Sequence, residues 1–280
     1  MMKVGLSSCN KEITEQLFEN YKRAGIDAIE FSLTPEQCKD FDYPMAARYA
    51  KKYGIEMWSY HLPFVPFDQI ELSVTDQKLR KQTIAWLSEL IRRGSDVGID
   101  KFVVHPSGEP IKDEERPERM KCAKESLAAL AGVAISCGSV IAVEDLPRTC
   151  LGRNSDEILE LIDADPALRV CFDTNHLLGE PITDFIHKVG DKIITTHISD
   201  YDFIDERHWM PGEGKINWNQ VIDAFEEVGY DAMWLYELGF RCPKTIMRER
   251  NFTCEDFARN AKEIFERKVP TTFCTYINLK

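Results

Sequence analysis

The sequence predicts a (β/α)8 barrel of the TIM type, and three observations carry this prediction. Short apolar runs alternate with helical patterns along the chain, which is the spacing of βα units joined into a parallel sheet. Eight such runs fit within 280 residues, as one barrel requires. Most runs end on Asp, Glu or His, and the carboxyl ends of barrel strands are where such enzymes build their sites. A doubly wound α/β sheet is the competing arrangement.

The elements follow one another in a regular order. The predicted strands are short apolar runs, and they span 3–8, 28–33, 56–60, 101–104, 140–143, 170–172, 193–196 and 232–236. The predicted helices have apolar residues at helical spacing, and they span 15–25, 45–53, 75–98, 120–137, 155–164, 182–192, 218–228 and 254–268. Gly25 and Gly54 stand where the first two helices stop.

The chain shows neither a linker-like stretch nor a low-complexity segment. Residues 1–280 are therefore expected to form a single α/β domain. Within it, residues 270–280 form a C-terminal extension that packs on the barrel or on a partner chain. The second arrangement would make a homo-oligomer.

Composition limits the classes of function. No apolar run approaches the ~20 residues of a membrane span, and the start of the chain lacks a signal-peptide pattern, so we expect a cytoplasmic protein without membrane contact. Thirty-five basic residues against 47 acidic ones give a net charge of −12, which opposes binding to nucleic acid. The nine Cys form no CxxC pair, which favours reduced thiols over disulfides or a thiolate zinc site.

Ligand-type side chains gather at the predicted strand ends. Six strand ends carry a candidate ligand or base: His61, His105, Glu144, Asp173, His197 and Glu237. A single His or Glu after a strand is more often a hydrogen-bonded or ion-paired residue without a catalytic role. Five of the six His, however, lie at strand ends or in the loop 206–214, and only His187 lies in a helical context. This repetition predicts one shared polar site.

The charges of this set indicate a metal ion. Three carboxylates converging on the barrel mouth repel one another and raise each other's pKa unless a cation compensates. A divalent metal held by Glu144, Asp173, Glu237 and His197 removes this conflict. Three carboxylates and one imidazole suit Mn²⁺, Mg²⁺, Co²⁺ or Zn²⁺ and do not select among them.

These residues also resemble a known group of enzymes, the xylose isomerase-like barrels. The resemblance covers nearly the whole chain from His61 to Glu237. It rests on Glu144 in Val-Glu-Asp-Leu-Pro, Asp173 and His176 in Phe-Asp-Thr-Asn-His, His197 in His-Ile-Ser-Asp, the Pro-Gly-Glu-Gly loop at 211–214, and Glu237. The superfamily includes sugar isomerases, ketose 3-epimerases, hydroxypyruvate isomerases, inosose dehydratases and zinc-dependent AP endonucleases.

The resemblance implies roles for individual residues. In the epimerase and isomerase branch, the residues matching Glu144, Asp173, His197 and Glu237 bind one metal, and the two glutamates move protons on opposite faces of the sugar. A carboxylate on each side of an acidified C–H can remove a proton and return one. The predicted substrate-binding residues are His61, His105, His176, Arg207 and His208. For Arg207, a salt bridge within its acidic loop is an equally good interpretation.

The predicted function is therefore a metal-dependent isomerase or epimerase of a sugar or sugar-like polyol in carbohydrate metabolism. The proton would move next to a carbonyl through a metal-bound enediolate. An inosose dehydratase-like lyase shares this first step, and a barrel that binds a small ligand without turnover is a further alternative.

An AP endonuclease-like phosphodiesterase is the remaining alternative. The residues matching that branch's zinc ligands agree in type, which allows a second or third metal, although Glu206 stands where that branch normally has Asp. The acidic balance and the lack of basic loops oppose this function.

Overall fold

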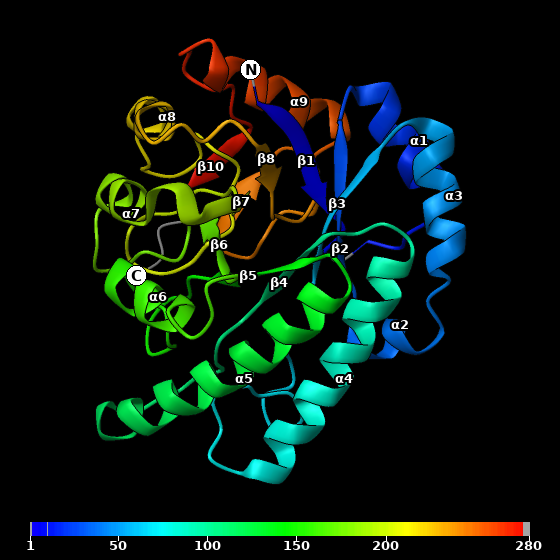
Figure 1. Ribbon diagram of the computed structural model, residues 1–280. Helices are drawn as coiled ribbons and strands as arrows, with labels where there is room; N and C mark the ends of the chain where they lie inside the picture. The colour runs from blue at the N-terminus through cyan, green and yellow to red at the C-terminus, as the bar shows by residue number, and fades with distance from the viewer. Residues whose placement is uncertain (1, 10, 277–280) are drawn as a thin grey trace.

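The computed structural model describes residues 2–9 and 11–276, and these form the predicted (β/α)8 barrel (Figure 1). Eight parallel strands follow the order β7-β6-β5-β4-β3-β2-β1-β8. Their bounds are β1 Lys3–Ser7, β2 Ala28–Ser32, β3 Glu56–His61, β4 Lys101–Val104, β5 Val140–Glu144, β6 Arg169–Asp173, β7 Ile193–His197 and β8 Met233–Tyr236. Beyond β7, Ile198 N donates to Leu235 O at 2.7 Å, and Glu237 N donates to Ile198 O at 3.3 Å. These bonds join the last two strands and close the barrel.

Helices surround the strands in Figure 1. Their bounds are α1 Glu15–Ala24, α2 Pro35–Asp40, α3 Tyr43–Tyr53, α4 Gln77–Asp96, α5 Arg116–Ser136, α6 Ser155–Ile162, α7 Ile182–Val189, α8 Trp218–Glu227 and α9 Cys254–Phe265. Polar side chains cap several of them: Thr14 accepts from Leu17 N at the start of α1, and Asn154 accepts from Glu157 N at the start of α6. Each cap supplies an acceptor for a backbone N–H that the helix leaves free.

Side chains alternate between two sides of each strand. On β5, Ile141 and Val143 belong to the large core between the strands and the helices, whereas Ala142 packs in a small separate cluster with Val103 and Cys171. Ala142 therefore faces the barrel interior, and the same alternation turns Glu144 inward. Because side chains alternate along a strand with a period of two residues, the ligand-type side chains at the strand ends point toward the axis of the barrel.

The structure adds short elements that periodicity does not reveal. Helix α2 has six residues, too few for a repeating apolar stripe, and is fixed by a capping box between Thr34 and Gln37. A separate two-stranded sheet pairs β9 (Ile246–Arg248) with β10 (Cys274–Tyr276), which follows α9, in antiparallel register. Part of the predicted extension 270–280 thus packs on its own chain, while residues 277–280 lie outside the described part.

Predicted helix ends are too long by a few residues in places. The helix expected over 182–192 stops at Val189, where Gly190 follows and a 3-10 turn covers Gly190–Lys192. The tightened turn leads directly into β7, which the sequence pattern does not distinguish from a further helical turn.

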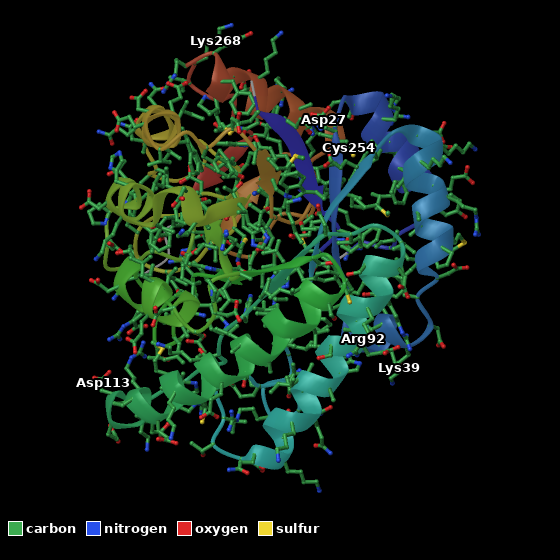
Figure 2. The ribbon with its side chains drawn as sticks, in the orientation of Figure 1. Asp27, Lys39, Arg92, Asp113, Cys254 and Lys268 are labelled. Atoms are coloured by element: carbon green, nitrogen blue, oxygen red, sulfur yellow. The ribbon has the colours of Figure 1, made fainter. Side chains whose placement is uncertain are left out.

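Figure 2 shows side chains filling the space between strands and helices. The labelled charged residues Lys39, Asp113 and Lys268 lie at the periphery, and all three are exposed. Among the described residues, no helix combines the length and the apolar character that crossing a membrane requires. All nine Cys are free thiols.

Candidate metal centre and active site

Four predicted ligands meet at the carboxyl end of the barrel. Glu144, Asp173 and His197 each end a strand, and Glu237 follows β8 directly. Each offers one donor atom, and these four atoms all lie within 4.8 Å of one another. His197 Nδ1 is 2.9 Å from Glu144 Oε1 and 3.1 Å from Glu237 Oε2. Four separate strands thus build one compact donor set.

The carboxylates of this donor set lack enough protein partners. Asp173 is fully buried; its Oδ1 accepts the Asn175 N–H at 2.6 Å, but Oδ2 has no hydrogen-bond partner in the described residues. Burial, together with the charges of Glu144 and Glu237, raises the pKa of Asp173 well above its usual value. A divalent cation would engage the open oxygen and relieve the repulsion. The residues present therefore fit a metal ion.

His197 provides the opposite charge among these donors. Burial lowers its pKa, but Cys171 and the surrounding carboxylates outweigh burial and raise the pKa well above the usual value. For Glu237, burial alone would raise the pKa, but the neighbouring His197 outweighs burial and lowers the pKa to about 2. The pKa of Glu144 is also held well below normal, against burial, by His197 and His105. Both glutamates are therefore ionised at neutral pH and able to bind a cation or accept a proton.

His61 and His105 form a second donor group with Glu144. The Nε2 atoms of His61 and His105 lie 3.0 Å and 3.2 Å from Glu144 Oε2. His61 Nδ1 is 3.0 Å from Leu62 O; a carbonyl only accepts, so this nitrogen is assigned the proton and Nε2 faces Glu144. Phe64 stacks on His105 with ring centroids 3.7 Å apart and fixes its plane.

A third donor group joins His176, Glu206 and His208. His176 Nδ1 donates to Asp145 O at 2.7 Å, and His208 Nδ1 donates to Glu237 O at 3.1 Å. With these protons on Nδ1, each Nε2 retains its lone pair for a ligand. His176 Nε2 lies 3.5 Å from Glu206 Oε2. His208 adopts a left-handed backbone conformation with φ of +50°, a strained geometry for a residue with a Cβ.

The Arg207 side chain forms a salt bridge within its own loop. Its Nε donates to Asp202 Oδ2 at 3.0 Å, and its backbone N–H donates to Asn175 Oδ1 at 2.9 Å. The salt bridge named as its alternative role is therefore formed, and the substrate-binding role of Arg207 stays a prediction.

A buried aspartate holds the loop that carries Glu206 and His208. Asp200 accepts the Gly212 N–H at 2.8 Å and the Trp218 indole N–H at 3.0 Å. A Cβ on Gly214 would lie 2.2 Å from Asp200 Oδ1, so the loop needs glycine there. Gly212 is also required, because its φ is +95°. The Pro-Gly-Glu-Gly motif thus positions the loop.

The three donor groups open into one cavity of about 350 Å³. Its walls combine ligand-type, apolar and charged residues: Cys9, His61, Phe64, Phe67, His105, Ser107, Glu109, Glu144, Leu146, Pro147, Arg148, Cys150, His176, Glu206, His208, Glu237, Leu238 and Gly239. Six predicted site residues are among them, and Asp173 and His197 lie beneath as part of the donor set. The structure therefore gathers these predicted residues in one place.

Arg148 was not predicted as a site residue. It follows β5 in a left-handed conformation with φ of +53°. Its guanidinium pairs with Glu109, with Asp205 at 2.8 Å and with Glu206 at 3.3 Å. It ties three loops together across the cavity. Its position directly after Leu-Pro at a strand end was the available signal.

Glu30 is the second site-proximal residue that the sequence did not reveal. It lies on β2, is fully buried and contacts His197 Nε2. Its signal was weak: one acid within the apolar run Ala28-Ile29-Glu30-Phe31, where an alternating strand often carries a solvent-facing acid.

Comparison with curated proteins finds relatives named as isomerases or epimerases of sugar-like compounds, and a relative named as an endonuclease. Inosose isomerase of Bacillus velezensis is 25% identical over 276 residues, covering 92% of this chain and 93% of the relative. Fructoselysine 3-epimerase of Escherichia coli O157:H7 is 27% identical over 154 residues, covering 52% of each chain. A probable endonuclease 4 of Finegoldia magna is 29% identical over 165 residues, covering 53% of this chain and 58% of the relative.

The fold and the family agree with the predicted architecture. The crystal structure of a D-tagatose 3-epimerase-like protein superposes with a TM-score of 0.76 at 23% identity, covering 95% of this chain and 96% of that one. The family model described as "Xylose isomerase-like TIM barrel" matches residues 18–253. The chain belongs to the xylose isomerase-like TIM barrel family.

Proposed function

We propose that this chain is a divalent-metal-dependent isomerase or epimerase of a ketose or a ketose-like polyol. The observation that carries the proposal is the donor set of Glu144, Asp173, His197 and Glu237, with both glutamates also facing the cavity. The names of the inosose isomerase and fructoselysine 3-epimerase relatives support the sugar class.

The proposed metal is held by Glu144, Asp173, His197 and Glu237, and this oxygen-rich set suits Mn²⁺, Mg²⁺, Co²⁺ or Zn²⁺. When bound, such an ion polarises a substrate carbonyl and acidifies the adjacent C–H.

Glu144 and Glu237 are the proposed proton carriers. The pKa values of both are held below the usual range, and the two side chains reach the cavity from the ends of different strands. One carboxylate removes the proton from the carbon beside the carbonyl, and the other returns a proton to that carbon or its neighbour. Return on the opposite face gives an epimer, and return to the neighbouring carbon gives an isomer.

The remaining cavity residues bind and enclose the substrate in this proposal. The Nε2 atoms of His176 and His208 carry lone pairs that accept hydrogen bonds from substrate hydroxyls. His61 and His105 line the same cavity beside Glu144. Phe64, Phe67 and Leu238 supply an apolar wall that reduces the access of water to the reacting carbon.

The third donor group favours a second candidate, a phosphodiesterase that uses several metals. His176, Glu206 and His208 could hold a further ion, and the probable endonuclease 4 is among the relatives. Two observations weigh against it. Arg148 already supplies Glu206 with a cation, and the net charge of −12 repels a phosphate backbone.

The test is turnover in deuterated water. The Mn²⁺-loaded protein is incubated with a panel of ketoses and inososes, and NMR follows both products and deuterium incorporation. We expect one substrate class to react with solvent deuterium entering beside the carbonyl. Glu144→Gln, which removes a proposed proton carrier, should lose this turnover. The matched control is Glu227→Gln, a change of an exposed surface glutamate, which should keep the wild-type rate. Cleavage of an abasic-site duplex without any sugar turnover would replace the isomerase by the second candidate.

A further inference from the structure

A second buried carboxylate lies behind the metal ligand His197. Glu30 Oε1 and Oε2 lie 3.1 Å and 3.2 Å from His197 Nε2, on the side of the ring away from the four-donor set. Ser59 Oγ donates to Glu30 Oε2 at 2.7 Å. Both Glu30 and His197 have no exposed surface. In the described part of the chain, His197 is the only basic group paired with Glu30.

This burial constrains the imidazole. Leaving an acceptor oxygen without a donor inside a protein is costly. Ser59 reaches only Oε2 of Glu30, so the hydrogen bond at Oε1 is assigned to a proton on His197 Nε2. The other nitrogen, Nδ1, faces Glu144, Glu237 and Asp173 at 2.9, 3.1 and 3.9 Å, and it is the nitrogen that would release its proton to hold a metal.

We propose that Glu30 is a positioning residue: it fixes the Nε2–H tautomer and the ring plane of His197, so that Nδ1 points at the metal site. Ser59 in turn fixes the Glu30 carboxylate. The inference rests on the metal site of the proposed function but not on the identity of the substrate. Carboxylates that orient a metal-bound histidine typically contribute 10–100-fold to metal affinity.

Glu30 does not act as a fifth ligand in this arrangement. It belongs to none of the candidate donor groups among the described residues, and the His197 ring stands between it and the other carboxylates. Its effect must therefore pass through the ring. A residue that only filled space in the barrel could be replaced by Leu without any change in metal affinity.

The experiment measures metal binding by equilibrium dialysis with Mn²⁺ and Zn²⁺ in wild type, Glu30→Gln and Glu30→Leu. We expect a 10–100-fold loss of affinity in Glu30→Leu and a smaller loss in Glu30→Gln, whose amide oxygen can still accept from Nε2. Ser59→Ala should cost less than either. Glu71→Gln is the matched control, because Glu71 is a buried carboxylate bound to Arg119 and Gly108 N and lies outside the donor groups.

A second measurement needs no variant. Nitrogen-15 NMR of the histidine rings in the Zn²⁺-loaded wild type should show His197 with a protonated, hydrogen-bonded Nε2 and a metal-bound Nδ1. The opposite assignment would overturn the proposal, and so would a folded Glu30→Leu protein with wild-type affinity. If the wild type binds no metal at all, the proposed function itself fails, and that outcome is distinct from the other two.

Discussion

Two adjacent layers inside the same barrel differ sharply in chemistry. The upper layer, at the strand ends, contains His105, Glu144, Asp173 and Glu237. Two residues earlier on three of these strands lies an apolar layer of Val103, Ala142 and Leu235. Both layers face the interior, because side chains alternate along a strand. A step of two residues along a strand therefore separates apolar side chains that stabilise the barrel from polar side chains that can bind a metal or move a proton.

Neutralising a proton carrier in the upper layer should have the largest effect. Glu237→Gln keeps the size of the side chain but removes its ability to accept a proton, so turnover should fall by ~10²–10⁴-fold. Substrate affinity should change much less. Steady-state kinetics that separate kcat from KM provide the measurement. A variant with wild-type kcat would remove Glu237 from the proton transfer.

Truncation in the apolar layer should affect stability instead. Leu235 is fully buried beside Met233 and Ala28. Leu235→Ala leaves a cavity, and such changes typically cost about 2–5 kcal/mol. Urea denaturation gives the free energy of unfolding, and dialysis of the folded fraction gives metal content per chain. The comparison of the layers breaks down if metal content falls while stability is unchanged.

The smallest effect on stability is expected outside the strands, at the start of the surrounding helix α9. Asp256 accepts from Thr253 N at 2.8 Å and pairs with Arg250 and Arg259, which hold its pKa well below the usual value against burial. Asp256→Ala removes the N3 partner of Thr253 in the capping box of α9 and should cost about 0.5–2 kcal/mol, the range typical of lost capping interactions.

The pH dependence of that loss follows from the sign of the shift. A carboxyl whose pKa is lowered by folding stabilises the protein above its unfolded pKa of about 3.9. This contribution disappears as the pH falls through the lower folded value. The difference in stability between wild type and Asp256→Ala should therefore begin to shrink as the pH falls below about 4 and keep shrinking toward the lower folded pKa, as followed by thermal unfolding. A difference that persists unchanged at pH 2 would assign the effect to packing alone.

The sequence predicted the residues of the upper layer better than the residues that contact and position them. Asp173 and His197 end apolar runs, so residue type and position reveal them together. Glu30 has an ordinary position in its strand, and only the closed barrel brings it beside His197, far away in sequence. Arg148 depends on a left-handed backbone and on three loops meeting above the cavity. Such contacts arise from tertiary structure, which local patterns do not contain.

The family match and the fold neighbours bear out the barrel and the family, whereas the roles of single residues stay predictions. The predicted substrate contacts of His61, His105, His176 and His208 are compatible with their places in the cavity wall. None of these positions identifies a particular sugar. Specificity depends on hydroxyl positions in a substrate, and several polar groups here can accept or donate in more than one orientation.

Metal content tests most directly whether the four strand-end residues Glu144, Asp173, His197 and Glu237 bind one divalent metal. Purified wild type, Asp173→Asn, His197→Ala and the control His187→Gln are loaded with Mn²⁺, dialysed and measured by elemental analysis, with circular dichroism to verify folding. His187 is a suitable control because it pairs with Glu227 on the surface. We predict one tightly held ion per chain in wild type and His187→Gln, and loss of that ion in the two ligand variants. Full occupancy in folded Asp173→Asn and His197→Ala would contradict the account.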